Sequence, residues 1–390
     1  MSHSPQVSIC IPSYNHARYL PQTIESALSQ TYRNIEIVIV DDGSTDDSLQ
    51  IAESYAAKYP EFIRVFTHPD HRNLGISATV NLGFLKSRGI YYSGLPSDDI
   101  LYPDKIERQV AFLENNPIVG WVYGFADYIN EYGERLLGRC GTDITQDPNP
   151  IERLIQGNAI AGATVLARRK CVEQVGLHDE TLVYSDWEYW VRFLAQWKVG
   201  FLKRSLVMFR QHTYNTSVGV EASVSVIRAL EVMNALRRKA PLIGGALTNL
   251  RTLALIDLQR TYYLFCTGDV KKASESLRSA FEIDPTLSHD AGYFARWLRE
   301  RLYEAIYTFE PGASERGFVS WILQHLPPAV EASFVRRMIG AKCAQAAFEH
   351  YKTDLPVARR MVLKCLKYDP RWLKDRSLLL IFMKSLIGLK

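Results

Sequence analysis

The sequence predicts an α/β domain with a mostly parallel central sheet, followed by an all-helical region. Between residue 5 and about residue 220, short apolar runs that suit buried strands alternate with segments of helical periodicity. That alternation is typical of a parallel sheet covered on both faces by helices. Beyond residue 220 the strand-like runs end and helical periodicity dominates. We therefore expect two domains, residues 1–220 and 221–390.

The expected elements follow from the spacing of apolar residues. Strands are expected at 7–11, 35–40, 63–66, 90–95, near 121–129 and at 163–167, where apolar residues run together. Helices are expected at 20–29, 47–58, 77–87, 105–115 and 186–197, where apolar residues recur every three or four positions. The acidic and hydroxyl side chains of residues 41–46 suit the cap of the second helix.

One internal repeat lies in the helical region. Residues 266–285 match residues 351–370, and the aligned pairs include Asp269 with Asp354, Ala273 with Ala358, and Asp284-Pro285 with Asp369-Pro370. A small alanine lets two helices approach closely, and a residue that precedes proline avoids helical backbone angles, so Asp-Pro ends each helix. The pattern resembles the tetratricopeptide helical hairpin, whose unit is about 34 residues. An irregular helical bundle is the alternative, and the sequence leaves both open.

Composition excludes several classes of protein. The chain has 390 residues, 47% of them hydrophobic and 23% charged, which is ordinary for a globular protein and wrong for a disordered or collagen-like one. The longest apolar run, 378–383, is far shorter than the roughly 18 residues of a membrane-spanning helix. The six cysteines form no CxxC pair, which suits reduced thiols in a cytoplasmic protein. The first residues resemble no signal peptide, so we expect no cleaved leader.

The net charge of +4 divides unevenly along the chain. Residues 1–220 hold 20 Lys and Arg against 25 Asp and Glu, whereas residues 221–390 hold 26 against 17. The basic half suits an anionic membrane surface, an acidic polymer or a protein partner, but it also suits a solvated face. We expect no nucleic-acid partner, since no known binding motif occurs. Segment 376–390 is apolar around most of its circumference, which favours burial over an interfacial anchor.

Polar side chains follow three of the expected strands. They are Ser13-Tyr14-Asn15, Asp41-Asp42-Gly43-Ser44 and Ser97-Asp98-Asp99. Ligands of an open parallel sheet bind beyond the carboxyl ends of its strands, so these residues predict a site at that edge. Asp42 suits a hydrogen bond from a nucleobase imide, and Tyr14 offers a flat face for stacking.

The pair Asp98-Asp99 suggests a divalent cation. Two adjacent carboxylates repel each other unless a cation or hydrogen-bond donors compensate. Oxygen ligands without a nearby cysteine suit Mg²⁺ or Mn²⁺, which complete their shells with phosphate oxygens and water. The alternative is that the two aspartates only cap the following helix. No glycine-rich fingerprint of a dinucleotide site or P-loop follows the strand that ends at Asp41-Asp42 or the strand that ends at Ser97-Asp98-Asp99.

Residues 184–192, YSDWEYWVR, place carboxylates beside indoles. Sugars pack their C–H faces on aromatic rings while their hydroxyls bond to acids, so Asp186, Trp187 and Glu188 are candidates for a saccharide site. The alternative is a plain helix with Asp186 as its N-cap and Trp190 in the core. We expect both, with Asp186 at the mouth of a cleft.

Together these motifs resemble the family 2 glycosyltransferases of the GT-A fold. The resemblance runs over about residues 5–217 and rests on an ordered set of segments: VSICIPSYN, VIVDDGSTDDS, RNLGISATVNLG, LPSDD, and SDWEYWVRF followed by FRQHTYNTS. It implies an inverting enzyme that moves a sugar from a nucleotide-sugar donor, with UDP preferred, to a hydroxyl of a saccharide or lipid-linked saccharide. A divalent cation, Mn²⁺ or Mg²⁺, is also implied.

The resemblance assigns roles to individual residues. The donor would contact Pro12, Ser13, Tyr14, Asn15, Asp42, Ser44, Asn73, Gly75 and Asp98, the last of them near the ribose. The metal would bind Asp99, with His212 near the metal or the phosphates. Asp186 would be the catalytic base, with Trp187 and Glu188 toward the acceptor. Many members carry Glu-Asp where this chain has Ser185-Asp186, so the base rests on Asp186, with Glu188 as an alternative.

Two other functions fit parts of the pattern. A nucleotidyltransferase would usually carry a glycine-rich basic loop after the first strand, and residues 12–18 contain no glycine and one arginine. A helical scaffold with an inactive transferase domain would not need Asp42, Asp98, Asp99 and Asp186 together. The helical half is not part of the catalytic family pattern. We expect a cytoplasmic enzyme, with peripheral contact at the inner face of the membrane left open.

Overall fold

The computed structural model describes residues 7–212, 222–288, 297, 301, 321–326, 332–351 and 354–387. The chain divides into two compact units, residues 1–252 and 253–390. The first is an α/β unit and the second is helical, as the sequence predicts. The domain boundary at residue 220 stays a prediction.

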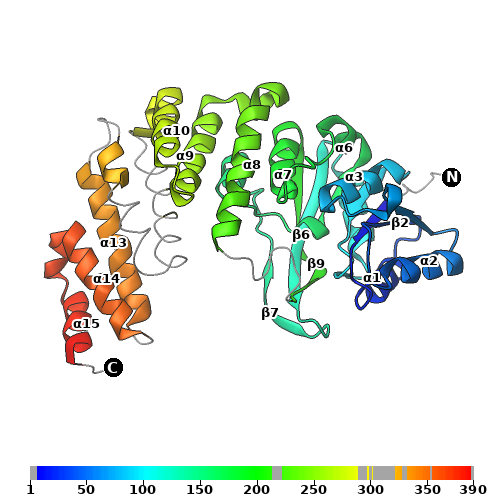
Figure 1. Cartoon of the computed structure of the whole chain (residues 1–390), viewed down its shortest axis with the longest axis horizontal. Coiled ribbons are helices and arrows are strands. Elements are labelled where there is room, and N and C mark those ends of the chain that lie inside the picture. The colour runs from blue at the N-terminus through cyan, green and yellow to red at the C-terminus, as the bar shows by residue number, and fades with distance from the viewer. Residues whose placement is uncertain are drawn as a thin grey trace. The chain divides into compact units, whose positions relative to one another are not determined.

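Among the described residues, the first unit contains one mixed sheet of nine strands (Figure 1). Its strands are β1 (Val7–Ser13), β2 (Ile35–Asp41), β3 (Ile63–Thr67), β4 (Tyr91–Gly94), β5 (Ile100–Leu101), β6 (Val119–Ile129), β7 (Arg135–Cys140), β8 (Leu166–Arg168) and β9 (Lys198–Arg210). Their order is β3-β2-β1-β4-β8-β6-β9-β5, and β7 pairs with β6.

Strands β1 to β4 form the parallel part of the sheet. Strand β1 pairs in parallel with β2 on one side and with β4 on the other, and β2 pairs in parallel with β3. The chain therefore adds β2 and β3 on one side of β1 and then returns to place β4 on the other side. In open α/β sheets such a reversal leaves a crevice beyond the carboxyl ends of the strands, where ligands bind.

The helices of this unit cover both faces of the sheet. They are α1 (Leu20–Leu28), α2 (Ser48–Lys58), α3 (Ile76–Lys86), α4 (Lys105–Asn115), α5 (Pro150–Gln156), α6 (Arg169–Val175), α7 (Ser185–Gln196) and α8 (Ala222–Ile243), with 3₁₀ turns at Pro69–His71, Gly162–Thr164 and Gly245–Thr248. In Figure 1, α3 and the pair α1 and α2 flank strand β2 on opposite sides. Every residue of β1 and β2 is buried, because helices shield both faces.

The expected elements before residue 200 are confirmed to within a few residues. Strand β9 was not expected, because the polar stretch from Lys203 to Ser205 interrupts its apolar residues, yet it is the longest of the described strands. It pairs in parallel with β6 through register shifts near Gly124 and Phe125, which let the polar residues leave the ladder. The short helices α5 and α6 and the strands β5 and β7 were also missed.

The second unit consists of helices in the part of the chain that the structure describes. They are α9 (Leu250–Cys266), which begins in the first unit, α10 (Val270–Ile283), α13 (Ala332–His350), α14 (Leu355–Tyr368) and α15 (Arg376–Ile387), with 3₁₀ turns at Pro285–Ser288 and Pro370–Lys374.

The two copies of the sequence repeat adopt the same local structure. Asp269 and Asp354 each cap a helix by accepting a hydrogen bond from the backbone N–H three residues on, of Lys272 and Val357. The aligned Ala273 and Ala358 are both fully buried. Both Asp-Pro steps end the helix and begin a 3₁₀ turn. Whether these pairs form a tetratricopeptide-type array stays a prediction.

Candidate active site

A cavity of about 610 Å³ lies where the sequence predicts the site. Pro12 at the end of β1, Pro96 and Asp99 after β4, and Asp186 at the start of α7 all line it. Most of the other lining side chains are apolar, Val80 and Trp190 among them. The ends of β1 and β4 and the candidate base, far apart in sequence, therefore share one cavity, whereas Tyr14, Asp42 and Asp98 are not among its lining residues.

The turns that follow β1 and β2 are bonded to each other. Asn15 has a positive φ of 52°, and its side-chain Oδ1 accepts a hydrogen bond from the Thr45 backbone N–H at 2.7 Å. The Asn15 backbone N–H donates to Ser44 Oγ at 3.0 Å. Ser13 is buried, whereas Tyr14 is 44% exposed, so the Tyr14 ring is accessible for stacking.

Asp42 fixes the loop before α3. Its Oδ1 accepts the Leu74 N–H at 2.7 Å and its Oδ2 accepts the Gly75 N–H at 3.0 Å. Asn73 is exposed next to them. The predicted donor segments after β1, after β2 and at residues 73–75 are thus brought together, although both oxygens of Asp42 already accept backbone N–H groups.

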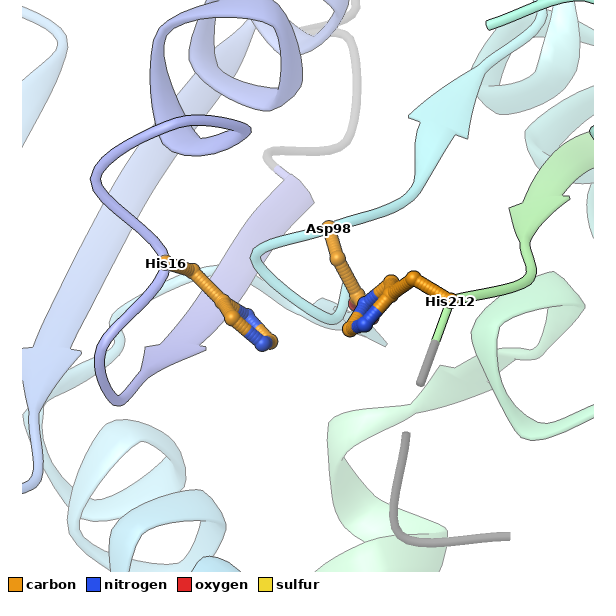
Figure 2. A group of neighbouring side chains, drawn as sticks. All are labelled: His16, Asp98 and His212. Atoms are coloured by element: carbon orange, nitrogen blue, oxygen red, sulfur yellow. The ribbon is translucent and has the colours of Figure 1, made fainter. Parts of the chain in front are cut away.

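Three side chains that can ligate a metal converge beside this region (Figure 2). His16, Asp98 and His212 come from the segments after β1, β4 and β9, and their potential ligand atoms lie within 4.8 Å of one another. His212 Nε2 lies 3.0 Å from Asp98 Oδ2. Burial lowers the pKa of His16, although the nearby Asp98 carboxylate opposes that shift. A largely neutral imidazole has the free lone pair that a metal ligand needs.

The neighbouring Asp99 has different surroundings. Its Oδ1 accepts the Arg210 backbone N–H at 2.9 Å, and its Oδ2 is buried without a hydrogen-bond donor among the described residues. Burial and the adjacent Asp98 raise the pKa of Asp99 well above its usual range. The cluster of metal-ligating groups therefore contains Asp98, where the sequence favoured Asp99.

Arg210 holds the Asp98-Asp99 turn in place. Its buried guanidinium donates from Nε to the Asp98 carbonyl oxygen at 2.8 Å and from Nη2 to Gln22 Oε1 at 2.6 Å. These bonds, together with the backbone bond to Asp99, join β9, α1 and the turn. The alternative in which the two aspartates cap a helix does not occur, because β5 follows them and Asp104 is the N-cap of α4.

Asp186 lies in the first turn of α7 and faces the cavity. Its Oδ2 accepts a hydrogen bond from Asn158 Nδ2 at 2.9 Å, and its Oδ1 accepts the Trp187 N–H at 2.8 Å. Withdrawal from bulk water raises the pKa of Asp186, and these two bonds oppose the rise. The N-cap of the helix is Tyr184, so Asp186 does not have the predicted capping role.

The two predicted acceptor contacts have protein partners instead. Trp187 is buried, and its Nε1 donates to the Leu154 carbonyl oxygen at 2.6 Å. Glu188 is fully buried, and its Oε1 accepts from Arg192 Nε at 2.7 Å. A helix turns about 100° per residue, so Tyr189 and Trp190 face the cavity with Asp186 while Trp187 and Glu188 do not. We therefore do not carry these two assignments further.

Sequence reasoning missed three residues of the site. His16 follows the first strand-end turn, and Arg210 stands two residues before His212 in FRQH, so both had a signal in segments already singled out. Asn158 had no signal in the sequence, because it lies in a loop 28 residues before Asp186 and only the fold brings the two residues together.

The chain is similar in sequence to known glycosyltransferases. Residues 8–176 match the model of the family described as Glycosyl transferase family 2. An uncharacterized glycosyltransferase of Rickettsia typhi is 34% identical over 228 residues, which cover 55% of this chain and 67% of that protein. EpsE of Bacillus subtilis, which bears a glycosyltransferase name, is 30% identical over 250 residues, 62% of this chain and 86% of that protein.

A solved structure shares the fold. Residues 1–349 of Staphylococcus aureus TarS, solved in complex with UDP-GlcNAc, superpose with a TM-score of 0.50 at 14% identity, covering 98% of this chain and 92% of that one. The fold and the homologues define a glycosyltransferase of GT-A type. The chain belongs to glycosyl transferase family 2. No helix among the described residues has the length and hydropathy to cross a membrane.

Proposed function

We propose that this glycosyltransferase moves a sugar, with inversion, from a UDP-sugar to a hydroxyl of a saccharide or lipid-linked saccharide. The carrying observation is that the strand-end residues Pro12 and Asp99 line the same cavity as Asp186. A donor held at the strand ends would present its anomeric carbon toward that carboxylate. The exposed ring of Tyr14 and the loop fixed by Asp42 would receive the nucleobase, with Ser13, Asn15, Ser44, Asn73 and Gly75 around them.

In this proposal Asp186 is the general base. Its carboxylate takes the proton from the acceptor hydroxyl, whose oxygen bonds to the anomeric carbon on the face opposite the diphosphate. The bond from that carbon to the diphosphate oxygen breaks, and its electron pair leaves on the nucleoside diphosphate. Attack from the opposite face inverts the anomeric centre. General-base catalysis of this kind contributes roughly 10²–10⁴-fold.

We further propose that Asp98, His212 and His16 hold the divalent cation. One carboxylate and two imidazoles form a softer donor set than carboxylates alone, which favours Mn²⁺ over Mg²⁺. When bound, the cation would neutralise negative charge on the leaving diphosphate. Asp99, with one oxygen on Arg210, would orient the turn rather than bind the metal.

A donor panel tests the transfer. Purified enzyme with Mn²⁺ is given UDP-, GDP- and dTDP-sugars, and release of the nucleoside diphosphate is measured. UDP-sugars lead the panel because TarS, which has the same fold, was solved with UDP-GlcNAc. We expect the wild type to turn over a UDP-sugar. In Asp186→Asn the turnover should fall about 10²–10⁴-fold, while the affinity for UDP is retained. The exposed Asp47→Asn serves as the control. Wild-type turnover in Asp186→Asn would remove the base.

Calorimetric titration with MnCl₂ tests the metal assignment. We expect Asp98→Asn and His212→Ala to lose most Mn²⁺ affinity, and His16→Ala to lose part of it. Asp99→Asn should retain Mn²⁺ binding, because Asp99 is outside the cluster. Loss of binding in Asp99→Asn with retention in Asp98→Asn would return the metal to Asp99.

UDP binding without turnover in the wild type would favour the alternative function, a helical scaffold with an inactive transferase domain.

For the helical half we propose two tetratricopeptide-like hairpins. The support is the matched pair of capped helices that begin at Val270 and Leu355, each with a buried alanine and a terminal Asp-Pro. We also propose that transferase function belongs to residues 1–220, with a cytoplasmic location. A membrane or protein partner would bind the basic half.

A further inference from the structure

Helix α15 and the 3₁₀ turn before it carry exposed apolar side chains. Leu373 in the turn is 54% exposed, and Leu380 and Met383 on the helix are 55% and 58% exposed. Leu378 and Ile381, by contrast, are buried. The sequence favoured burial of segment 376–390, but of residues 376–384, whose burial the structure describes, only one side is covered.

The charged groups near these side chains are basic. Positions 376, 380, 383 and 384 lie on one side of an α-helix, so Arg376 and Lys384 flank Leu380 and Met383. Lys374 is exposed beside Leu373. We call Leu373, Lys374, Arg376, Leu380, Met383 and Lys384 the α15 face. Helix α15 contains no acidic residue.

The excess of positive charge extends to the neighbouring helix. Residues 355–387 contain eight Lys and Arg against two Asp. Both acids have partners within the fold, since the buried Asp369 binds Arg371 and Asp375 accepts the Leu378 N–H at 2.9 Å. The α15 face therefore presents positive charge next to apolar side chains.

An open hollow of about 680 Å³ adjoins this face. Lys374, Arg337 and the indole of Trp372 line it, together with Asp375 and the ion pair of Arg371 with Asp369. Arginine and lysine recognise phosphate, and an indole suits the boundary between water and acyl chains. The hollow thus has room and chemistry for a phosphate-bearing headgroup.

We propose that the α15 face binds the surface of an anionic phospholipid bilayer, with Leu373, Leu380 and Met383 entering the boundary between headgroups and acyl chains. An acidic polymer would be attracted by the charges, but it would leave the three apolar side chains in water. Mixed basic and apolar helix faces gain from both terms at an anionic interface. The proposal concerns attachment and does not depend on the donor, acceptor or metal assigned above.

Vesicle co-sedimentation of the full chain tests it. We expect binding to vesicles of phosphatidylcholine with 30% phosphatidylglycerol and little binding to phosphatidylcholine alone. Each basic side chain at the surface should raise the affinity for the anionic vesicles about fivefold. Raising the salt should weaken binding without abolishing it, because the apolar contribution is not screened. Failure to bind, or equal binding to both vesicles, would overturn the proposal.

Matched variants locate the binding surface. Leu380→Gln with Met383→Gln should weaken vesicle binding by about tenfold, whereas Leu85→Gln with Ile118→Gln should not, although those residues are 64% and 65% exposed. The double variant Lys374→Gln with Arg376→Gln should weaken vesicle binding more than the control double variant Lys58→Gln with Lys203→Gln, whose lysines are exposed elsewhere. Unchanged far-ultraviolet circular dichroism confirms folding.

Two outcomes of the variants would overturn the assignment. Undiminished binding in both α15-face variants would place any lipid site elsewhere. Competition by soluble polyglutamate that abolishes vesicle binding, with no effect of Leu380→Gln and Met383→Gln, would assign the face to an acidic polymer.

Discussion

At the residue scale, two adjacent aspartates have opposite surroundings. Asp98 lies 3.0 Å from an imidazole nitrogen of His212, whereas Asp99 has one oxygen on a backbone N–H and the other buried. The turn of residues 96–99, closed by a hydrogen bond from the Asp99 N–H to the Pro96 carbonyl oxygen, directs the two side chains to different neighbours, and only Asp98 joins the histidines. The sequence could identify the pair but not which member faces the metal-ligating groups.

Asn158 orients the proposed base. Its Oδ1 accepts the Ile160 N–H at 3.1 Å, so its Nδ2 is the atom that donates to Asp186. That bond stabilises the carboxylate and lowers its pKa against the effect of burial. The other titratable groups that line the same cavity are Tyr92, Asp99, Tyr128, Cys140, His178, Tyr184 and Tyr189. None of them is a hydrogen-bond partner of Asp186 among the described residues.

We predict that Asn158→Ala moves the acidic limb of the kcat/KM profile to higher pH by about one unit. The base acts when deprotonated, so activity is lost as the pH falls through a pKa that the variant raises. Turnover on the plateau should also fall roughly tenfold, since the carboxylate loses its orientation. Steady-state rates from pH 5 to 9 measure both effects. An unchanged acidic limb would make Asn158 a structural residue only.

Lys105 is a buried amine outside the site. Its side chain is fully buried and Nζ donates to Ser93 Oγ at 2.8 Å. Burial lowers the pKa of Lys105 from 10.5 to about 7. Between those values the unfolded chain binds a proton that the folded chain does not, so the free energy of unfolding should rise with pH from 7 to 10.5.

We predict that Lys105→Met stabilises the protein most at pH 7, by up to about 4 kcal/mol, and little at pH 10.5. Urea denaturation of wild type and variant across this range gives the difference curve. The exposed Lys58→Met should show no such trend. Parallel curves for Lys105→Met and wild type would mean that Lys105 is charged in the fold.

At the element scale, the turn after β2 fits closely against the loop that precedes α3. Gly43 has a φ of +74°, and a Cβ there would lie 2.5 Å from the His71 carbonyl oxygen and 2.8 Å from the Asn73 nitrogen. Both neighbours are backbone atoms, which cannot rotate away. The predicted donor pocket thus depends on a glycine at this point.

We predict that Gly43→Ala costs at least about 1–2 kcal/mol of stability and weakens UDP binding. The added methyl group would push the two donor segments apart. Gly157→Ala is the control, because its backbone is extended and a Cβ there meets no atom within 4 Å. Thermal unfolding and calorimetric UDP titration give the two quantities. Normal UDP affinity in Gly43→Ala would remove this turn from the donor site.

Elements with a strong pattern were predictable and those without one were not. Strands β1 and β2 are continuous apolar runs, because both their faces are covered. Strand β9 has an interrupted pattern, and β7 is exposed along most of its length, so neither carries a periodic signal. Their positions follow from pairing with β6, which is a long-range property.

At the scale of the whole molecule, α8 belongs to the compact unit of residues 1–252. Its buried side chains include Val232, Met233 and Leu236. Lys239 on the same helix binds Asp179 at 2.7 Å and Glu188 on α7 at 3.2 Å. A domain that ended at residue 220 would lose these contacts.

We predict that a fragment of residues 1–252 unfolds at a temperature several degrees higher than a fragment of residues 1–220. Without α8, apolar surface of the first unit is exposed and the fully buried Glu188 loses one of its two cations. Circular dichroism on heating measures the difference. Equal midpoints would support the boundary at residue 220.

The sequence by itself determined the alternation of strands and helices, the family, and the strand ends at which the site lies. These follow from local periodicity and from the rule that parallel sheets bind ligands at their carboxyl edge. Only the tertiary structure decided that Asp98 joins His16 and His212, that Asn158 contacts Asp186, and that Glu188 is buried. Those facts depend on contacts between segments far apart in the chain and on which side of a turn or helix a residue faces. Neither is encoded in local spacing.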